Sequence, residues 1–169
     1  TDDRQLGRYD DFQFYPVADI PSDSDLTSLS ADVSGTVWAA NSTELFEVRG
    51  ASNQSSGVDV DIRRYSGFDD IGRIFIDREE TLWLSSGSRL VRFLGSRFQH
   101  YKLQTGPDPE TIWGVTEDAV GRFWFATQER VLIRNQDESL TLLGEEHGVP
   151  EEAVRDILTG PDDLIWAGF

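Results

Sequence analysis

Short runs of apolar residues recur along the chain, and each run is followed by a polar turn and a second apolar run that carries a tryptophan. The runs are rich in β-branched and aromatic residues, which is typical of strands. Four of the five tryptophans, Trp38, Trp83, Trp124 and Trp166, stand 45, 41 and 42 residues apart. A period of about 40–45 residues predicts a repeated unit of four short strands.

The repeat extends beyond the tryptophan. Twelve and nine residues before it, every unit has an aliphatic residue: Leu26 and Leu29, Ile71 and Ile74, Ile112 and Val115, Val154 and Ile157. Two residues after it, every unit has a small residue: Ala40, Ser85, Ala126 and Gly168. Small residues in a strand suit the close approach of a neighbouring sheet. We therefore predict an all-β chain, a β-propeller whose four-stranded antiparallel blades stack side by side.

A turn separates the first two strands of each unit. Three units have an aspartate six residues before the tryptophan, and two have a glycine three residues before it: Asp32, Asp77 and Asp118, with Gly35 and Gly121. Such an aspartate bonds its own backbone two residues further on, and glycine supplies a positive φ. The other units depart from this pattern at Glu80, Gly160 and Asp163.

The units divide the chain into segments. We expect complete blades at 20–66, 67–106 and 107–147, a half-blade of third and fourth strands at 1–19, and a half-blade of first and second strands at 148–169. The stretch 53–57 belongs to a polar insertion that lengthens the first unit and is expected to be a surface loop.

The two half-blades are complementary, which has two interpretations. They could meet and close a small ring with no exposed edge. Alternatively, the chain could be a piece of a longer propeller. We favour the second interpretation because the chain starts at Thr1 and contains no methionine.

Composition narrows the possible partners. The chain has 15 Lys and Arg against 31 Asp and Glu, a net charge of −16, which argues against nucleic acid and anionic membranes as partners. There is no cysteine, which excludes disulfides, zinc thiolate sites and a cysteine nucleophile. Two separate histidines, His100 and His147, favour neither a metal site nor a catalytic triad. Asp59 and Asp61 could share a strand face, but solvated charges explain them better than calcium. We expect no cofactor.

The repeat resembles that of the two-component regulator propeller family. The residues that carry the resemblance are Ile112, Val115, Asp118, Gly121, Trp124, Ala126 and Thr127, with Leu6, Arg8 and Tyr9 for the third strand and Phe98 and Tyr101 for the fourth. The resemblance implies a periplasmic or extracellular sensor region, usually of seven blades, in a membrane-anchored histidine kinase or diguanylate cyclase. Membrane attachment would then come from segments outside this sequence. The family's motif encodes no ligand contact.

One tryptophan, Trp113, lies outside the repeat. Its counterparts in the other units are Thr27, Gly72 and Arg155. First strands line the central channel of a propeller, so Trp113 and Arg155, with neighbouring Arg73 and Asp156, could form a ligand-contacting mouth. Trp113 could instead be a large core residue beside Gly114. The ligand would be a small molecule, a saccharide or a protein, and a homodimer is possible.

Three functions fit the sequence. The first is a non-enzymatic sensor that recognises a ligand and passes a shift to attached signalling domains. The second is a propeller lyase similar to virginiamycin B lyase, which would need histidine and acidic ligands gathered at the channel. The third is a protein-interaction scaffold. The sequence does not separate the first from the third.

Overall fold

The computed structural model describes residues 4–50, 60–103, 111–128, 130–150 and 152–169, and these form strands with one short 3-10 helix, η1 (Glu145–His147). Blade 1 contains β3 (Ser28–Ala31), β4 (Val37–Ala40), β5 (Glu44–Arg49) and β6 (Asp61–Ser66). Blade 2 contains β7 (Ile71–Ile76), β8 (Leu82–Ser86), β9 (Arg89–Phe93) and β10 (Phe98–Lys102). Blade 3 contains β11 (Ile112–Glu117), β12 (Phe123–Thr127), β13 (Val131–Arg134) and β14 (Leu140–Leu143).

Each blade is an antiparallel sheet in which the strands follow one another in chain order. The N-terminal half-blade contains β1 (Arg4–Asp10) and β2 (Gln13–Ile20), and the C-terminal half-blade contains β15 (Asp156–Thr159) and β16 (Ile165–Gly168). The all-β, four-stranded blade architecture predicted from the repeat is therefore confirmed. Strand β2 extends to Ile20, one residue beyond the predicted half-blade at 1–19, and Phe12 lies in the turn before it with a positive φ.

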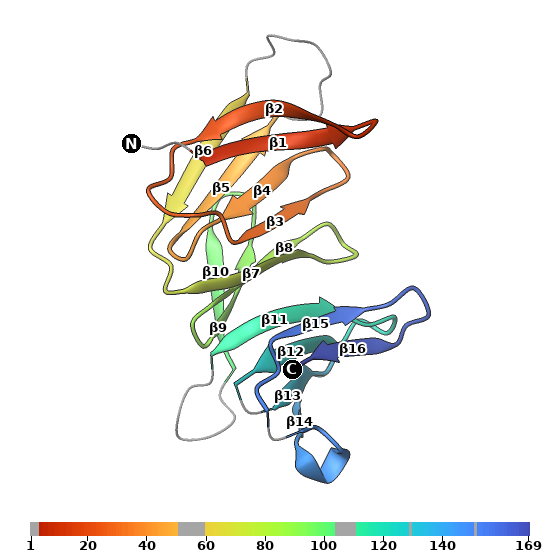
Figure 1. Ribbon diagram of the computed structural model, residues 1–169. Helices are drawn as coiled ribbons and strands as arrows, with labels where there is room; N and C mark the ends of the chain where they lie inside the picture. Colours follow the sequence, from red (N-terminus) through yellow and green to blue (C-terminus); the bar gives the residue numbers. More distant parts are fainter. Residues whose placement is uncertain (1–3, 51–59, 104–110, 129, 151) are drawn as a thin grey trace.

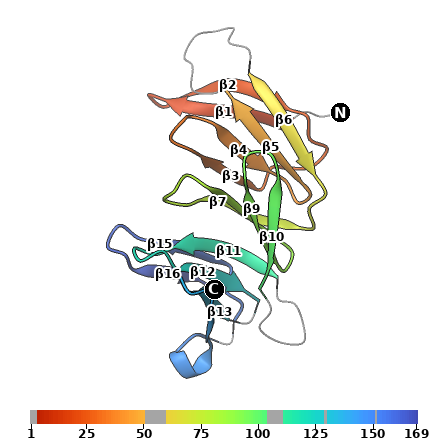
Figure 2. The same cartoon turned by 180° about the vertical axis from the view of Figure 1, so that it is seen from behind.

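The blades follow one another in an open row, with the N-terminal half-blade at one end and the C-terminal half-blade at the other (Figures 1 and 2). The two half-blades are separate two-stranded sheets. The interpretation in which they meet within one chain is therefore wrong for this structure. The insertion at 53–57 and the expected boundary between 106 and 107 lie outside the described residues.

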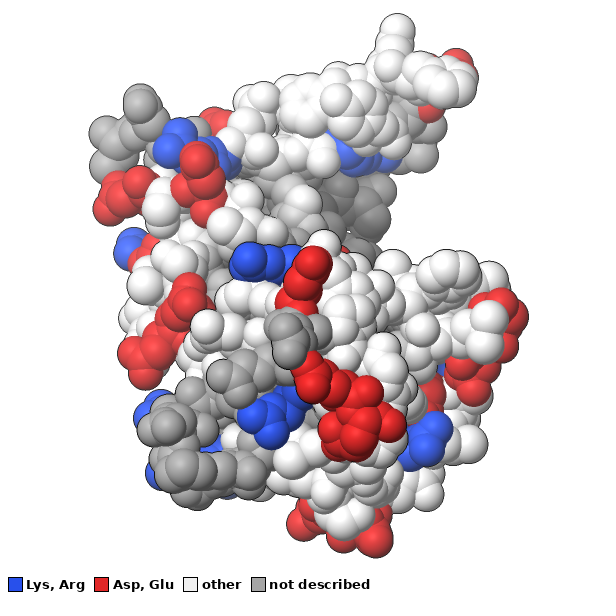
Figure 3. Space-filling view, turned by 60° about the horizontal axis from the view of Figure 1, so that its bottom comes forward, with Lys and Arg blue, Asp and Glu red and all other residues white. Residues whose placement is uncertain are grey.

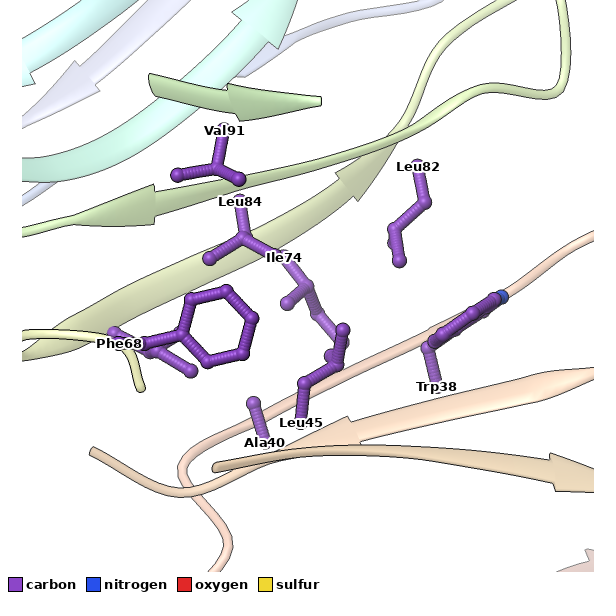
Figure 4. Packing of buried hydrophobic residues seen from close by; sticks show 9 residues of the cluster. Trp38, Ala40, Leu45, Phe68, Ile74, Leu82, Leu84 and Val91 are labelled. Atoms are coloured by element: carbon purple, nitrogen blue, oxygen red, sulfur yellow. The ribbon is translucent and has the colours of Figure 1, made fainter. Parts of the chain in front are cut away.

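The core lies between the blades and is divided into clusters, one at each junction. The cluster between blades 1 and 2 combines Trp38, Ala40 and Leu45 with Ile74, Leu84 and Val91, among others (Figure 4). Leu45 and Leu84 are fully buried there, and each such side chain stabilises the fold by about 1.5–3 kcal/mol. Similar clusters join blade 2 to blade 3, and each half-blade to its neighbour. No blade buries both of its faces alone, as the repeat predicted.

The four repeat tryptophans differ in burial along the row. Trp38 and Trp83 are 4% exposed and Trp124 is half-buried, whereas Trp166 is 60% exposed. Trp38 packs edge-on against Phe93 of blade 2 with ring centroids 5.1 Å apart, and Trp83 lies 4.9 Å from Phe123 of blade 3. The indole rings of Trp38 and Trp83 therefore pack against the sheet that follows them. No sheet follows Trp166 among the described residues, which explains its exposure.

The turn between first and second strands has the same backbone in all four units. In each, the residue three before the tryptophan has a positive φ: 83° at Gly35, 61° at Glu80, 80° at Gly121 and 62° at Asp163. The hydrogen bond that Gly160 receives across its turn from the amide of Asp163 matches those at Asp32, Asp77 and Asp118. The turn conformation is therefore kept even where glycine and aspartate are replaced.

Acidic side chains of one unit bind the turn of the preceding unit. The amide of Val33 donates to Glu80, that of Arg78 to Glu117, and that of Ala119 to Asp163, at 3.0, 3.1 and 2.6 Å. Two of these acceptors, Glu80 and Asp163, stand where the repeat has glycine. At these two positions a carboxylate side chain replaces glycine, which adopts a positive φ without strain. In return, the carboxylate accepts a hydrogen bond from the preceding unit.

The turn aspartates also bind tryptophan in two of the blades. Asp77 accepts from Trp83 Nε1 at 2.7 Å, and Asp118 accepts from Trp124 Nε1 at 2.8 Å. Burial by itself raises the pKa of Asp118, but hydrogen bonds from Trp124, from Arg122 and from the Val120 amide outweigh it, so the pKa lies below its usual value. The aspartate is therefore ionised at neutral pH and holds both the turn and the indole ring.

Candidate functional site

The first strands of successive units lie side by side, as expected of strands that line the axis of a propeller. The amide of Ile74 in β7 donates to Ser28 Oγ in β3 at 3.0 Å. The amide of Thr159 in β15 donates to Thr116 Oγ1 in β11 at 3.1 Å. These bonds fix the neighbouring first strands against one another, so residues at matching repeat positions lie close together.

Two glycines allow this close approach. A Cβ on Gly72 would lie 2.8 Å from the carbonyl oxygen of Ile112 and 2.9 Å from Ser85 Oγ. A Cβ on Gly114 would lie 3.1 Å from the Ile157 amide nitrogen. A side chain at either position would force neighbouring strands apart, and each glycine stands beside one of the candidate site residues, Arg73 or Trp113.

The pairing of first and second strands is irregular at the same positions. Strand β7 shifts register between Ile71 and Ile74, and β11 shifts between Ile112 and Gly114. The Arg73 amide, which falls in the first shift, donates instead to Ser85 Oγ at 2.9 Å. Bulges of this kind re-aim a side chain relative to a regular strand. They place Arg73 and Trp113 at the start of their strands in orientations that a regular ladder would not give.

The structure brings the four predicted residues together as two pairs, which we call the mouth cluster (Arg73, Trp113, Arg155 and Asp156). The Arg155 guanidinium carbon lies 4.4 Å from the centroid of the Trp113 ring, a cation–π contact. Arg73 forms an ion pair with Asp156. The pairs join blade 2 and blade 3 to the C-terminal half-blade. Trp113 is half-buried, which fits both a ligand-contacting position and a packing role beside Gly114.

The mouth cluster has an uneven charge. The side chains of Arg73 and Asp156 are 40% and 50% exposed, so their pairing contributes only about 0–1 kcal/mol to stability. They nevertheless neutralise each other. Arg155 is exposed and forms no ion pair with any residue that the structure describes. Its guanidinium lies over an aromatic ring and keeps its donors for an outside group, which suits a carboxylate or phosphate.

The remaining candidates lie apart from the cluster. His100 is exposed on β10, and His147 in η1 lies 3.2 Å from a Glu146 carboxylate oxygen. Asp61 pairs with Arg63 at 3.5 Å, and Asp59 is outside the described residues. Within the described ranges, no three His, Asp or Glu side chains are grouped as metal ligands.

Acidic side chains are spread over the molecular surface in several separate groups, with Lys and Arg between them (Figure 3). In the part of the chain that the structure describes, no helix is both long enough and apolar enough to cross a membrane.

Solved structures with the same arrangement of blades can be identified. The extracellular domain of a hybrid two-component system from B. thetaiotaomicron superposes with a TM-score of 0.68 at 16% identity, covering 97% of this chain and 26% of that one. Virginiamycin B lyase from Staphylococcus aureus gives 0.68 at 18%, covering 87% and 50%. PorZ, a surface component of the type-IX secretion system of Porphyromonas gingivalis, gives 0.63 at 12%, covering 99% and 29%.

The chain has the β-propeller fold. It spans a quarter to a half of the length of these propellers. Neither protein-family models nor curated proteins gave a match. The neighbours include extracellular domains of hybrid two-component systems, in agreement with the family resemblance of the repeat. They also include a lyase and a secretion component, so the blades alone do not decide the function.

The sequence predicted that these four residues lie close together, because Trp113 and Arg155 hold one position of the repeat and Arg73 and Asp156 hold the next. Sequence reasoning did not find the bonds between consecutive turns, and it treated Glu80 and Asp163 only as departures from glycine. The signal was available: each replaces glycine with a carboxylate at the same repeat position.

Proposed function

We propose that this chain is part of a non-enzymatic sensor propeller, in the periplasmic or extracellular portion of a membrane-anchored signalling protein. Its mouth cluster recognises a ligand that carries an anionic group. The observation that carries the proposal is Arg155, a cation held against Trp113 without an anionic partner among the described residues, while the adjacent Arg73 is neutralised by Asp156.

The geometry supports recognition as the role of this cluster. An anionic ligand would meet one free guanidinium, one aromatic edge and an ion pair whose members could exchange partners. These groups belong to three successive units: Arg73 lies in β7, Trp113 in β11 and Asp156 in β15, and Arg155 directly precedes β15. A ligand bound there would contact several blades at once, and its binding would favour one relative placement of those blades over another. That is the physical requirement for passing a shift to attached domains.

The ligand is tested by thermal shift with the purified chain and a panel of glucuronate, citrate and an acidic peptide. A specific ligand raises the unfolding temperature in a concentration-dependent manner. We expect Arg155→Gln and Trp113→Leu to abolish the response. The matched control is Arg63→Gln, which removes a cation from β6 without touching the mouth cluster. Equal responses in all variants would remove the cluster from the proposal.

The signalling role is tested by the reading frame around this sequence. We expect a membrane-spanning helix and a histidine kinase or diguanylate cyclase domain in the same protein. A propeller without any membrane segment or output domain would favour the interaction scaffold instead.

A lyase is the second candidate, because lyase propellers match about as well as the sensor domains. One of those structures is a catalytically inactive variant, with a histidine replaced, bound to quinupristin. The two histidines here lie on β10 and in η1, away from the first strands. We expect no consumption of quinupristin by this chain in a chromatographic assay, and turnover that is lost in His100→Ala or His147→Ala would reverse the assignment.

A further inference from the structure

A groove of about 630 Å³ lies between blades 1 and 2, on the face that carries the turns. Its walls come from the turn at 32–36, from β4 and β5, and from the ends of β7 and β9. We call it the inter-blade groove. It is separate from the mouth cluster, none of whose residues lines it. Its volume is within the range of roughly 300–1,000 Å³ typical of small-molecule sites.

The groove contains an unpaired donor and an unpaired acceptor that the other complete blades pair with each other. Trp83 and Trp124 donate their indole N–H groups to Asp77 and Asp118. The corresponding pair in blade 1 is open: three hydrogen bonds reach Asp32 Oδ1, from Ser34 and Thr36, and none from Trp38. Neither Trp38 Nε1 nor Asp32 Oδ2 has another hydrogen-bond partner among the described residues.

The tryptophan of blade 1, Trp38, lines the groove. Trp38 is 4% exposed, and its ring packs among Leu82, Leu84 and Ile74 of blade 2. Its nitrogen is at the end of the ring that points away from the core cluster (Figure 4). This N–H group has no acceptor among the described residues, so it is available to a molecule in the groove.

The walls carry more negative than positive charge. Asp32, Glu47 and Glu80 line the groove together with two cations, Arg49 of blade 1 and Arg92 of blade 2. Glu47 is 2% exposed and is satisfied from both sides, by Arg49 Nε at 2.7 Å and by the Tyr65 hydroxyl at 2.7 Å. Arg49 therefore compensates the buried Glu47, which leaves two carboxylates, Asp32 and Glu80, and one guanidinium, that of Arg92. The Arg92 guanidinium carbon lies 5.3 Å from the centroid of the Trp83 ring, and its buried Nε has no hydrogen-bond partner among the described residues.

Asp32 is ionised under ordinary conditions. Burial by itself raises its pKa, but the hydrogen bonds from Ser34 and Thr36 outweigh that effect, so the pKa lies below the usual value. Glu80 keeps one carboxylate oxygen for the Val33 amide. Apolar wall is supplied by Phe93, Ile76 and Leu82.

We propose that the inter-blade groove binds a small organic ammonium ion that also carries a hydrogen-bond-accepting oxygen. The ammonium group bonds to Asp32 and Glu80, and the oxygen accepts from the Trp38 indole N–H. The apolar wall takes the carbon skeleton. An anion would meet two carboxylates against the single guanidinium of Arg92, and an apolar molecule would leave both Trp38 and Asp32 unpaired. The proposal is independent of the function assigned to the mouth cluster.

The test uses three probes of matched size: glucosamine, glucose and glucuronate, which are cationic, neutral and anionic at neutral pH. The readout is the Trp38 indole N–H signal in a ¹⁵N NMR correlation spectrum, assigned by its loss in Trp38→Phe. We expect glucosamine to shift this signal in a saturable way, glucose to shift it at higher concentration and glucuronate to leave it in place.

Two variants test the charges. Asp32→Asn removes one carboxylate and is expected to weaken glucosamine binding about tenfold, the effect of losing one charge-assisted hydrogen bond. Glu80→Gln keeps an acceptor for the Val33 amide and is expected to weaken it by a smaller factor. Arg155→Gln is the control and should have no effect. Added salt should weaken binding in the unmodified chain.

Three results would overturn the proposal: no shift of the Trp38 signal with glucosamine, equal affinity for glucosamine and glucose, or unchanged affinity in a folded Asp32→Asn variant. A cooperative unfolding transition of each variant, with a midpoint well above the assay temperature, shows that it is folded without probe. If no anionic ligand raises the unfolding temperature while glucosamine still shifts the Trp38 signal, the proposed function is refuted and the groove proposal is not. If an anionic ligand raises the unfolding temperature while glucosamine leaves the Trp38 signal in place, only the groove proposal is refuted.

Discussion

The replacement Asp77→Asn isolates the bond between turn and tryptophan. Asp77 is 8% exposed; its Oδ1 accepts from the amides of Glu79 and Thr81 at 2.9 and 2.8 Å, and its Oδ2 accepts from Trp83 at 2.7 Å. An asparagine can keep the two backbone bonds through its amide oxygen. Its NH₂ group then faces the indole N–H, which places two donors against each other in a buried site.

The magnitude follows from this geometry. A hydrogen bond to a charged group contributes about 1.5–3 kcal/mol, and leaving a buried donor unpaired adds to the loss. Asp32→Asn is the matched control, because Asp32 holds the same turn and has no bond to Trp38. We expect Asp77→Asn to be less stable than Asp32→Asn by about 2 kcal/mol, which corresponds to about 4–8 °C in unfolding temperature for a chain of this size.

The assay is thermal and urea unfolding of both variants, followed by far-ultraviolet circular dichroism at several protein concentrations. Equal loss of stability in the two variants would show that the indole bond contributes nothing measurable. A larger loss of stability in Asp32→Asn than in Asp77→Asn would refute the reasoning, because the hydrogen bonds within the turn would then contribute more than the bond to the tryptophan.

Three further predictions follow from the turns and the close strands. Glu80→Ala should lower the free energy of unfolding by about 1 kcal/mol, because it loses the hydrogen bond to the Val33 amide and keeps the positive φ. Glu80→Gly relieves the strain of that φ and should stay near the parent in stability. Urea unfolding midpoints separate the two variants, and identical midpoints would contradict the strain argument. Because the pKa of Asp118 is lower in the folded than in the unfolded chain, its contribution to the free energy of unfolding is complete above about pH 4 and is lost as pH falls through the folded pKa. The difference in stability between the parent and Asp118→Asn should therefore narrow in acid. A difference that widens in acid would be inconsistent with the lowered pKa. Gly72→Ala should destabilise by about 1–3 kcal/mol because its methyl group meets backbone, while Gly168→Ala, with no atom within 4 Å, should be close to neutral in thermal unfolding.

The architecture was predictable because one residue type marks every unit. An indole ring every 41 to 45 residues, with aliphatic and small residues at fixed offsets, leaves little freedom in how the strands pair. The mouth cluster was predictable for the same reason: in-phase positions such as those of Trp113 and Arg155 become neighbours once adjacent first strands lie side by side.

Other features depend on geometry that the pattern does not encode. Asp32 and Trp38 have the same spacing as Asp77 and Trp83, yet only the second pair is bonded. In blade 1 the serine at position 34 adds a hydroxyl donor to Asp32 that the other turns lack at this place. The sequence shows the serine, but whether the carboxylate turns toward it or toward the indole is set by competing bonds of similar strength.

The row of bonds between consecutive turns has a consequence for cooperativity. In arrays whose units touch only their neighbours, stability is a sum of unit and interface contributions. Each bond from Val33, Arg78 or Ala119 adds to an interface contribution and leaves the unit contributions unchanged. A chain without them would melt over a broader temperature range, blade by blade, and the acidic residues at the turns help the row behave as one body.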